Sequence, residues 1–272
     1  MNPGGHTVGV FDSGVGGLSV LRALLAEIPD AHFIYVADSA YAPYGERTAA
    51  DVIERSQRIT AQLRREYPLD AMVVACNTAT AHAIDALRLT HHDLPFVGVE
   101  PALKPAAALS QTRHIGIMAT RGTLESARFC KLQTRMEHGE HPPIFHNQPC
   151  DGLADAIERG DGATTRTLCE RYVGTLMAQA PANAPIDTLV LGCTHYPFEA
   201  QLLQSLCGPS VRMVETGAPV ARRTREVLRE RRLATAQAKP DLVLLTTGDP
   251  QALCTVAHRW LGTAATPRYW SC

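Results

Sequence analysis

The sequence predicts an α/β protein made of two similar lobes, each with a mainly parallel sheet flanked by helices. Several short apolar runs are continuous rather than alternating, which is typical of parallel strands buried on both faces. Amphipathic stretches lie between these runs, so strands and helices alternate along the chain. Two segments, MVVACNT and LVLGCTH, share one pattern about half a chain apart, which favours two related lobes.

Nine apolar runs are the predicted strands. In chain order they are TVGVFD (7–12), HFIYVAD (32–38), MVVAC (72–76), PFVGVE (95–100), HIGIMAT (114–120), PIFHN (143–147), TLVLGC (188–193), VRMVET (211–216) and DLVLLTT (241–247). The stretches between them have apolar residues at i, i+3 and i+4, which predicts helices that connect the strands by right-handed crossovers. These helices span 18–28, 50–66, 79–88, 124–136, 166–178, 199–207 and 219–231.

Composition and charge exclude several classes of protein. The chain has 272 residues, of which 45% are hydrophobic and 19% charged, so it can bury a substantial core. Its net charge is −1, and the basic stretch at 221–232 is spaced like a solvated helix face, so no nucleic-acid partner is expected. No secretory signal and no apolar span of about 20 residues is present, which predicts a cytoplasmic protein without a membrane partner.

The eight cysteines are spread widely along the chain. Since no CxxC pair occurs, no zinc or other metal site and no redox pair is expected. Most of these residues are expected to be reduced thiols that act as small apolar fillers. Cys76 and Cys193 differ because each ends an apolar strand and stands directly before polar residues and a helix.

Polar clusters follow most of the predicted strands. In open α/β sheets, ligands bind beyond the carboxyl ends of the strands, beside helix N-termini. The clusters are Asp12-Ser13 with a glycine loop, Asp38-Ser39 followed by Tyr44-Gly45, Cys76-Asn77-Thr78, Thr120 to Thr123, and Cys193-Thr194-His195. The glycine loop lacks the spacing of a dinucleotide fingerprint, and no P-loop is present. Asp12, Ser13, Asn77, Thr78 and Thr194 also suit helix caps, a structural role that does not exclude ligand contact.

Two cysteines in matching positions indicate proton transfer. A thiol at a helix N-terminus has its pKa lowered from about 8.5 and can serve as a base near neutral pH. One thiolate could remove a proton from one face of a carbon while the opposing thiol returns a proton to the other face, without metal or cofactor. Hydroxyl and amide groups would support the carbanion that forms; candidates are Ser13, Asn77, Thr78, Thr120 and Thr194.

Two other classes of function remain open on these residues. Cys193 with His195 alone could form the nucleophile pair of a hydrolase, although this gives no reason for the cluster at Cys76. A non-catalytic ligand-binding α/β protein could carry both cysteines as structural residues. In that case, alanine at either position would affect stability only.

Six segments together resemble the cofactor-independent aspartate/glutamate racemase family, and within it the glutamate racemases. They are GVFDSGVGGLSVL (9–21), YAPYGER (41–47), VVACNTATA (73–81), GVEPALKPA (98–106), IGIMATRGT (115–123) and VLGCTHYPF (190–198). The resemblance extends from about residue 7 to about residue 230 and preserves the order of the motifs. Aspartate racemases of the same family also carry a cysteine pair, but the PYG and GCTHYP segments favour glutamate.

The resemblance implies interconversion of L- and D-glutamate, which supplies D-glutamate for peptidoglycan. It implies that Cys76 and Cys193 transfer the protons, assisted by Asp12 and His195 respectively, and that Glu158 occupies the place of a family glutamate. The substrate-contacting residues implied are Asp12, Ser13, Tyr44, Gly45, Asn77, Thr78, Thr194 and His195. No cofactor is implied.

The resemblance also implies a fold and an assembly. Residues 1–100 with 212–272 would form the first lobe and residues 101–211 the second, with the active site in the cleft between them. Dimers are common in the family, so a homodimer that binds a small-molecule substrate is expected.

Overall fold

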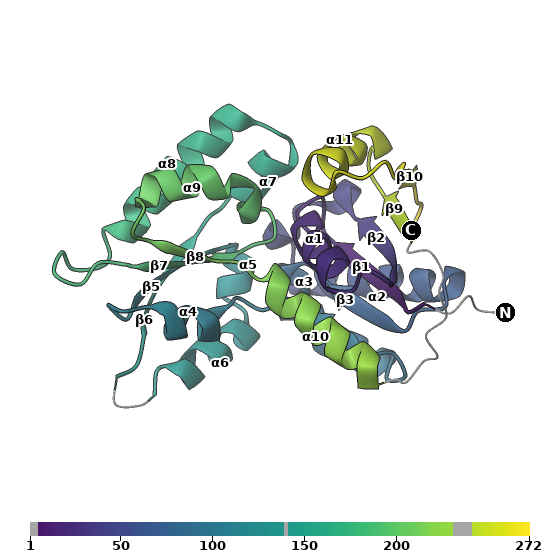
Figure 1. Cartoon of the computed structure of the whole chain (residues 1–272), viewed down its shortest axis with the longest axis horizontal. Helices are drawn as coiled ribbons and strands as arrows, with labels where there is room; N and C mark the ends of the chain where they lie inside the picture. Colours follow the sequence, from purple (N-terminus) through teal and green to yellow (C-terminus); the bar gives the residue numbers. More distant parts are fainter. Residues whose placement is uncertain (1–4, 139–140, 231–240) are drawn as a thin grey trace. The chain divides into compact units, whose positions relative to one another are not determined.

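The computed structural model describes residues 5–138, 141–230 and 241–272. It has the expected α/β fold, with two parallel sheets flanked by helices (Figure 1). The chain divides into two compact units, Met1–Val99 with Gly217–Cys272 and Glu100–Thr216. Among the described residues, no helix is both long and apolar enough to cross a membrane.

The first unit is built on a six-stranded parallel sheet with the order β10-β9-β2-β1-β3-β4. Its strands are β1 (Thr7–Asp12), β2 (His32–Ala37), β3 (Ala71–Val74), β4 (Phe96–Gly98), β9 (Leu242–Thr246) and β10 (Arg268–Tyr269). Asp12 pairs with Ala37 and Phe11 pairs with Val74, so the carboxyl ends of the central strands meet at one edge. The polar residues that follow these strands therefore gather at that edge.

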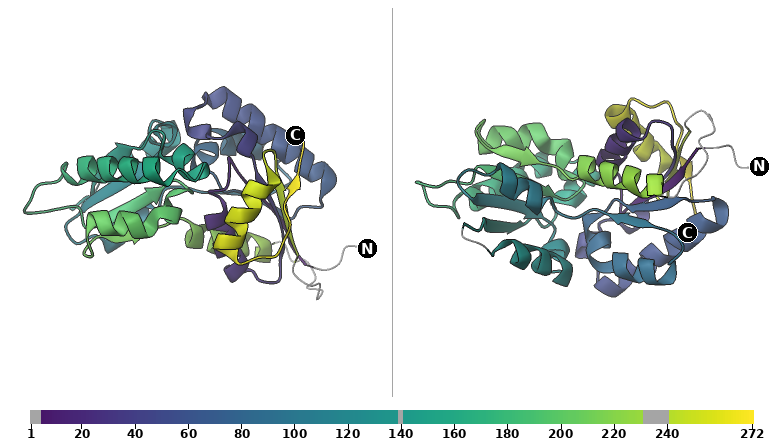
Figure 2. Two further views of the ribbon diagram at one scale, coloured as in Figure 1. Left: turned by 90° about the horizontal axis from the view of Figure 1, so that it is seen from above. Right: turned by 60° about the horizontal axis from the view of Figure 1, so that its bottom comes forward.

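Two groups of helices cover the first sheet. Helices α2 (Ala49–Glu66) and α3 (Asn77–Thr90) pack together, whereas α1 (Leu18–Glu27) packs against α10 (Gly217–Glu230) and α11 (Pro250–Leu261) (Figures 1 and 2). The 3₁₀ helices η1 (Ser39–Tyr41) and η2 (Tyr44–Glu46) lead from β2 into α2. Thr48 ends this connection, because its hydroxyl accepts the backbone N–H of Asp51 and caps α2.

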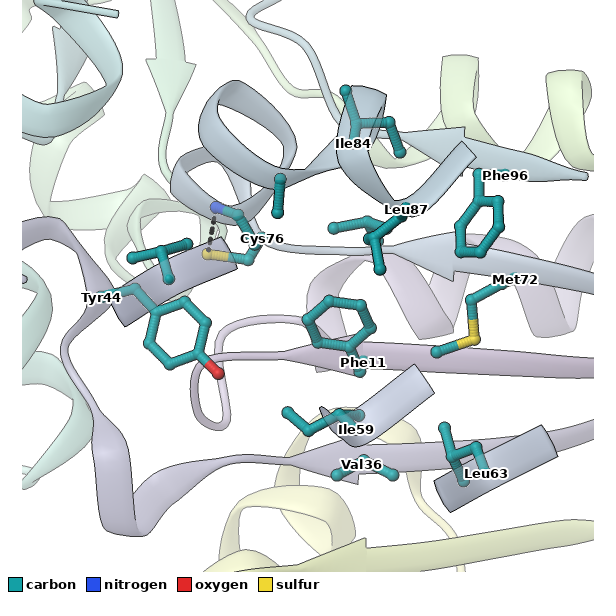
Figure 3. Close-up of a cluster of buried hydrophobic side chains, with 14 of the residues drawn as sticks. Phe11, Val36, Tyr44, Ile59, Leu63, Met72, Cys76, Ile84, Leu87 and Phe96 are labelled. Carbon is teal, nitrogen blue, oxygen red and sulfur yellow. Dashed lines mark hydrogen bonds between the residues drawn. The ribbon is translucent and has the colours of Figure 1, made fainter. Parts of the chain in front are cut away.

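The core between the first sheet and α2 and α3 extends to the carboxyl edge of the strands. Phe11, Val36 and Met72 contribute the strand side of this core, and helix residues such as Ile59 complete it. Figure 3 shows Tyr44 and Cys76 at one end of the cluster and Leu63, Met72 and Phe96 at the other. The core thus fixes the backbone from which the site residues of this unit project.

The second unit has a four-stranded parallel sheet with the order β6-β5-β7-β8. Its strands are β5 (His114–Ala119), β6 (Ile144–Pro149), β7 (Thr188–Gly192) and β8 (Arg212–Val214). Ala119 pairs with both Pro149 and Gly192, so Thr120, Cys150 and Cys193 follow three strands that end together.

Side chains of the second sheet alternate between two helical layers. Ile117 and Val190 pack with α4 (Leu103–Leu109) and α6 (Ala127–Met136). Leu189 and Leu191 pack with α8 (Gly162–Met177) and α9 (Ala200–Cys207) on the other face (Figure 1). The remaining helices of this unit are α5 (Arg121–Leu124), α7 (Leu153–Glu158) and the 3₁₀ helix η3 (Tyr196–Glu199).

The nine predicted strands are present, but three details differ from the prediction. The helix expected over 124–136 is interrupted, because the Ser126 hydroxyl accepts the N–H of Phe129 and starts α6 as a new helix. Residues 212–216 were expected in the first lobe, but β8 pairs with β7 and belongs to the second unit. Helices α4, α7 and α11 and strand β10 were not predicted. Residue 231 of the helix expected at 219–231 lies outside the described residues.

Candidate active site

Cys76 lies at the start of α3, as the sequence predicted. It is the N-cap residue, and its Sγ accepts the backbone N–H of Ala79 at 3.4 Å (Figure 3). The Ser13 Oγ lies 3.7 Å from the same sulfur, and both residues are buried. The thiol thus sits against the positive end of the helix dipole, which favours the thiolate.

Asp12 organises the glycine loop that follows β1. Its fully buried carboxylate accepts the backbone N–H groups of Gly14 at 3.2 Å and Gly17 at 2.9 Å. The Tyr35 hydroxyl donates to the Gly14 carbonyl at 2.7 Å from below the same loop. A Cβ atom at Gly17 would lie 2.5 Å from the Asp12 Cβ, so this close approach requires glycine. These contacts make Asp12 the residue that holds the glycine loop before α1 (its assistance to Cys76 stays a prediction).

Asn77 follows Cys76 and has an uncommon environment. Its side chain is 4% exposed, and neither amide atom has a hydrogen-bond partner in the part of the chain that is described. A buried unpaired polar group destabilises a fold by about 1–3 kcal/mol, so such groups usually reflect a function. An amide next to a buried thiol at a strand end is therefore a strong candidate for ligand binding. Thr78 is buried beside it.

The hydroxyl of Tyr44 is bound within the protein. It donates to Asp38 Oδ2 at 2.5 Å, and Arg55 donates to both oxygens of the same carboxylate at 2.8 Å. Burial and the neighbouring Asp38 carboxylate raise the pKa of Tyr44 well above its usual value, so the phenol stays neutral. Gly45 is half-buried, so a substrate contact at these two residues would come from the backbone of the loop.

Cys193 forms a chain of groups with the buried His195 and the half-buried Glu158 in the second unit. The Cys193 Sγ lies 3.7 Å from His195 Nδ1, and His195 Nε2 lies 2.7 Å from Glu158 Oε2. Burial lowers the pKa of His195, but its hydrogen bonds to Cys193 and Glu158 outweigh this effect, and the pKa is raised well above its usual value. Glu158, at the end of α7, thus favours an imidazolium that can pair with a Cys193 thiolate.

The surroundings of Cys193 differ from those of Cys76. The short η3 follows Cys193 first and has His195 as its N-cap, ahead of the helix predicted at 199–207. Helix α9 begins only at Ala200. The imidazole of His195 therefore occupies the place beside Cys193 that the N-terminus of α3 occupies beside Cys76.

Thr120 and Thr194 lie at the same sheet edge as Cys193. The Thr120 hydroxyl accepts the N–H of Thr123 at 3.3 Å and caps the short α5. Thr194 is buried directly after the thiol. Both positions lie where the sequence predicted substrate hydroxyl donors, and the Thr120 hydroxyl also serves as a helix cap.

The remaining buried cysteines behave as apolar fillers. Burial raises the pKa of Cys169 to about 12 and that of Cys207 to about 11. Burial also raises the pKa of Cys150, which lies at the end of β6 and interacts with the Tyr196 hydroxyl. These thiols are therefore neutral near pH 7. Among the described residues, no group of three or more His, Cys, Asp or Glu side chains is placed to hold a metal ion.

Comparison with known proteins identifies the class of this protein. Parallel sheets flanked by helices, with thiols and an imidazole after the strand ends, make this an α/β protein with a candidate enzyme site. The profile of the Asp/Glu/hydantoin racemase family matches residues 12–224. The chain belongs to this family, and it is therefore an isomerase.

Individual relatives agree with the family. The glutamate racemase of Pseudomonas paraeruginosa is 43% identical over 266 residues, which cover 97% of this chain and 88% of that protein. The crystal structure of a glutamate racemase from Bacillus anthracis superposes with a TM-score of 0.85 at 28% identity and covers 98% of this chain and 97% of that one. The Escherichia coli glutamate racemase, solved with L-glutamate and the activator UDP-MurNAc-Ala, has a TM-score of 0.84 at 32% identity, with 97% of both chains covered.

Proposed function

We propose that this protein interconverts L- and D-glutamate by a two-base mechanism that uses Cys76 and Cys193. One thiolate removes the α-proton from one face of the substrate, and the opposing thiol donates a proton to the other face. The reverse reaction exchanges the two roles. The proposal requires both thiols to reach one bound glutamate from opposite sides.

The observation that carries this proposal is the matched position of two buried thiols in a member of this family. Each follows an interior strand of its own parallel sheet, and each has a group beside it that would favour the thiolate. For Cys76 this group is the N-terminus of α3, and for Cys193 it is His195. Burial instead raises the pKa values of the buried Cys169 and the half-buried Cys207.

The substrate would be held by groups that surround these thiols. The Asn77 amide has free donor and acceptor capacity, and the hydroxyls of Ser13, Thr78 and Thr194 lie at the same strand ends. Such donors can bind a carboxylate and stabilise the charge that develops when the α-proton leaves. The solved relative from Escherichia coli holds L-glutamate, which supports glutamate as the substrate here.

Deuterium exchange tests the proposed function. The purified, reduced and EDTA-treated protein, incubated with L-glutamate in D₂O, should form D-glutamate that carries deuterium at the α position. Circular dichroism would follow the racemisation, and mass spectrometry would follow the label. L-Aspartate is the control substrate and should react far more slowly. Absence of both racemisation and exchange would contradict the proposal.

The biological setting follows from the same resemblance. D-Glutamate made in the cytoplasm would supply peptidoglycan synthesis, so depletion of this protein should be rescued by external D-glutamate. A homodimer is also proposed, and sedimentation velocity would distinguish it from a monomer.

Glu158→Gln should change the pH dependence of the reaction. The carboxylate of Glu158 helps to raise the pKa of His195, so a neutral amide lowers that pKa and the imidazolium loses its proton at lower pH. The alkaline limb of kcat/KM should move to lower pH, with a loss of roughly tenfold at the alkaline end. A pH–rate profile would measure the shift.

The pH dependence of the free energy of unfolding gives a second measurement of the same effect of Glu158 on His195. Because the pKa of His195 is raised in the folded protein, its charged form stabilises the fold below the usual value of 6.5, and this contribution is lost as pH rises through the raised value. Glu158→Gln should move that loss to lower pH. Glu170→Gln, on the exposed surface of α8, is the matched control and should leave both profiles unchanged. An unaltered profile in Glu158→Gln would show that Glu158 does not act on His195.

A further inference from the structure

The Asp38 carboxylate is the centre of a buried network in the first unit. It is fully buried and accepts four hydrogen bonds, from the Tyr44 hydroxyl, the Thr247 hydroxyl at 2.8 Å and two nitrogens of Arg55. Arg55 is also buried and stacks on the Tyr41 ring, with its guanidinium 3.8 Å from the ring centroid. A planar guanidinium held on one face and at two nitrogens has a fixed orientation.

The last residues of the chain lie along the same helix, α2. The third guanidinium nitrogen of Arg55 donates to the backbone oxygen of Cys272 at 2.7 Å. Gln62 donates to the backbone oxygen of Ser271 at 2.7 Å, and the Trp270 indole N–H donates to Glu66 at 2.9 Å. Positions 55, 62 and 66 fall on one side of α2, so this helix contacts residues 270–272 continuously.

We propose that Arg55 is a positioning residue for the substrate loop at residues 43–45, and that residues 271–272 set its position. Arg55 joins the chain end on one side to Asp38 on the other, and Asp38 in turn holds the Tyr44 hydroxyl. Because Tyr44 is fixed through its side chain, the backbone of the loop is held for contact with the substrate. This inference rests on the proposed function, since it assigns the loop to glutamate binding.

The network predicts an effect on substrate binding rather than on proton transfer. The described hydrogen bonds of the network include no bond to Cys76, Cys193 or His195, although Tyr44 and Cys76 belong to one core cluster. A loosened loop should weaken the binding of glutamate in the ground state and transition state alike, which raises KM and leaves kcat nearly unchanged.

Arg55→Lys is the first test. Lysine keeps the positive charge but cannot bridge both oxygens of Asp38 and the Cys272 backbone oxygen at the same time. We expect KM for L-glutamate to rise about tenfold, with kcat within about threefold of the wild type. Arg58→Lys is the matched control, because Arg58 is exposed on the same helix and pairs with Glu54, and it should keep the wild-type KM.

A chain that stops at Trp270 is the second test, and it does not depend on the folding of a buried substitution. It removes the backbone acceptors at residues 271–272, while Arg55 keeps Asp38, Gln62 keeps Glu66, and the Trp270 contact with Glu66 remains. We expect KM to rise about threefold. Combined with Arg55→Lys, the truncation should add nothing further, because both changes act through the same guanidinium.

The outcomes separate this inference from the proposed function. Raised KM in both variants with nearly constant kcat supports the positioning role. If the truncated chain and Arg55→Lys both keep the wild-type KM, the positioning role is overturned. The proposed function still stands in that case, provided that the wild-type protein racemises glutamate. A kcat that falls with the folded fraction, at constant KM, also overturns it. A wild-type protein that does not racemise glutamate overturns both.

Discussion

Cys76→Ala and Cys193→Ala should each lower the rate of glutamate racemisation by about 10³-fold or more, because each removes one of two proton-transferring groups. Circular dichroism at saturating L- and D-glutamate would measure the loss. Both variants should remain folded. Cys76→Ala loses the cap on Ala79, which costs about 1 kcal/mol, a small part of the stability of a domain.

The retained thiol gives a sharper readout than the loss of racemisation. With only one base present, α-proton exchange in D₂O can still begin with the enantiomer whose proton faces that thiol. The two variants should therefore exchange opposite enantiomers, which no structural role of the cysteines predicts. Cys130→Ala is the matched control, because this thiol is exposed, and it should change activity by less than about twofold.

Two results would count against this mechanism. If either alanine variant racemised glutamate at the wild-type rate and lost only stability, its thiol would be structural. If Cys76→Ala kept full activity, Cys193→Ala lost it, and the wild-type protein accumulated a covalent adduct on the Cys193 sulfur, a Cys193–His195 nucleophile would be indicated instead.

The strands were predictable because parallel strands buried on both faces are continuously apolar, as in TLVLGC and HFIYVAD. Strand β10 has only two residues, both exposed, and so leaves no such pattern. The break between α5 and α6 depends on the Ser126 hydroxyl binding the Phe129 N–H. A serine inside an amphipathic stretch does not show whether it caps a helix or lies on its surface.

The sequence placed its candidate site residues directly after the strands, and the fold brings the carboxyl ends of neighbouring strands together at one edge of each sheet. The network around Asp38 could not be read in the same way. Arg55 lies in an ordinary amphipathic helix, where arginines are normally solvated, and its partner Cys272 is 217 positions away. Only tertiary packing brings these groups together.

The sequence also indicates candidate substrate-binding residues without showing which of their polar atoms are already hydrogen-bonded within the protein. Tyr44 and Asn77 were both expected to contact substrate. In the fold, the Tyr44 hydroxyl is bound to Asp38, whereas both amide atoms of Asn77 lack a partner among the described residues. Side-chain chemistry alone cannot separate these cases, because the difference depends on groups far away in the sequence.

Asn77→Ala should lower kcat/KM for glutamate by about 10- to 100-fold, because it removes hydrogen bonds to a charged substrate. Steady-state kinetics in both directions would measure the loss. An amide that is hydrogen-bonded within the protein would behave differently, because its removal would leave its hydrogen-bond partner unsatisfied. The free amide of Asn77 has no such partner among the described residues, so its loss should fall on the substrate alone.

The same substitution should not lower the stability of the ligand-free protein. The unpaired amide already costs about 1–3 kcal/mol of desolvation, so its removal should leave the free energy of unfolding unchanged or increase it. Thr80→Ala, three residues further along α3, is the matched control with the opposite pattern. The Thr80 hydroxyl donates to the Val74 carbonyl and accepts the Val99 N–H, so alanine should cost stability by about 1–2 kcal/mol and keep KM. Urea unfolding of both variants would separate the two cases, and a destabilised Asn77→Ala with wild-type kinetics would assign the amide to the fold rather than to the substrate.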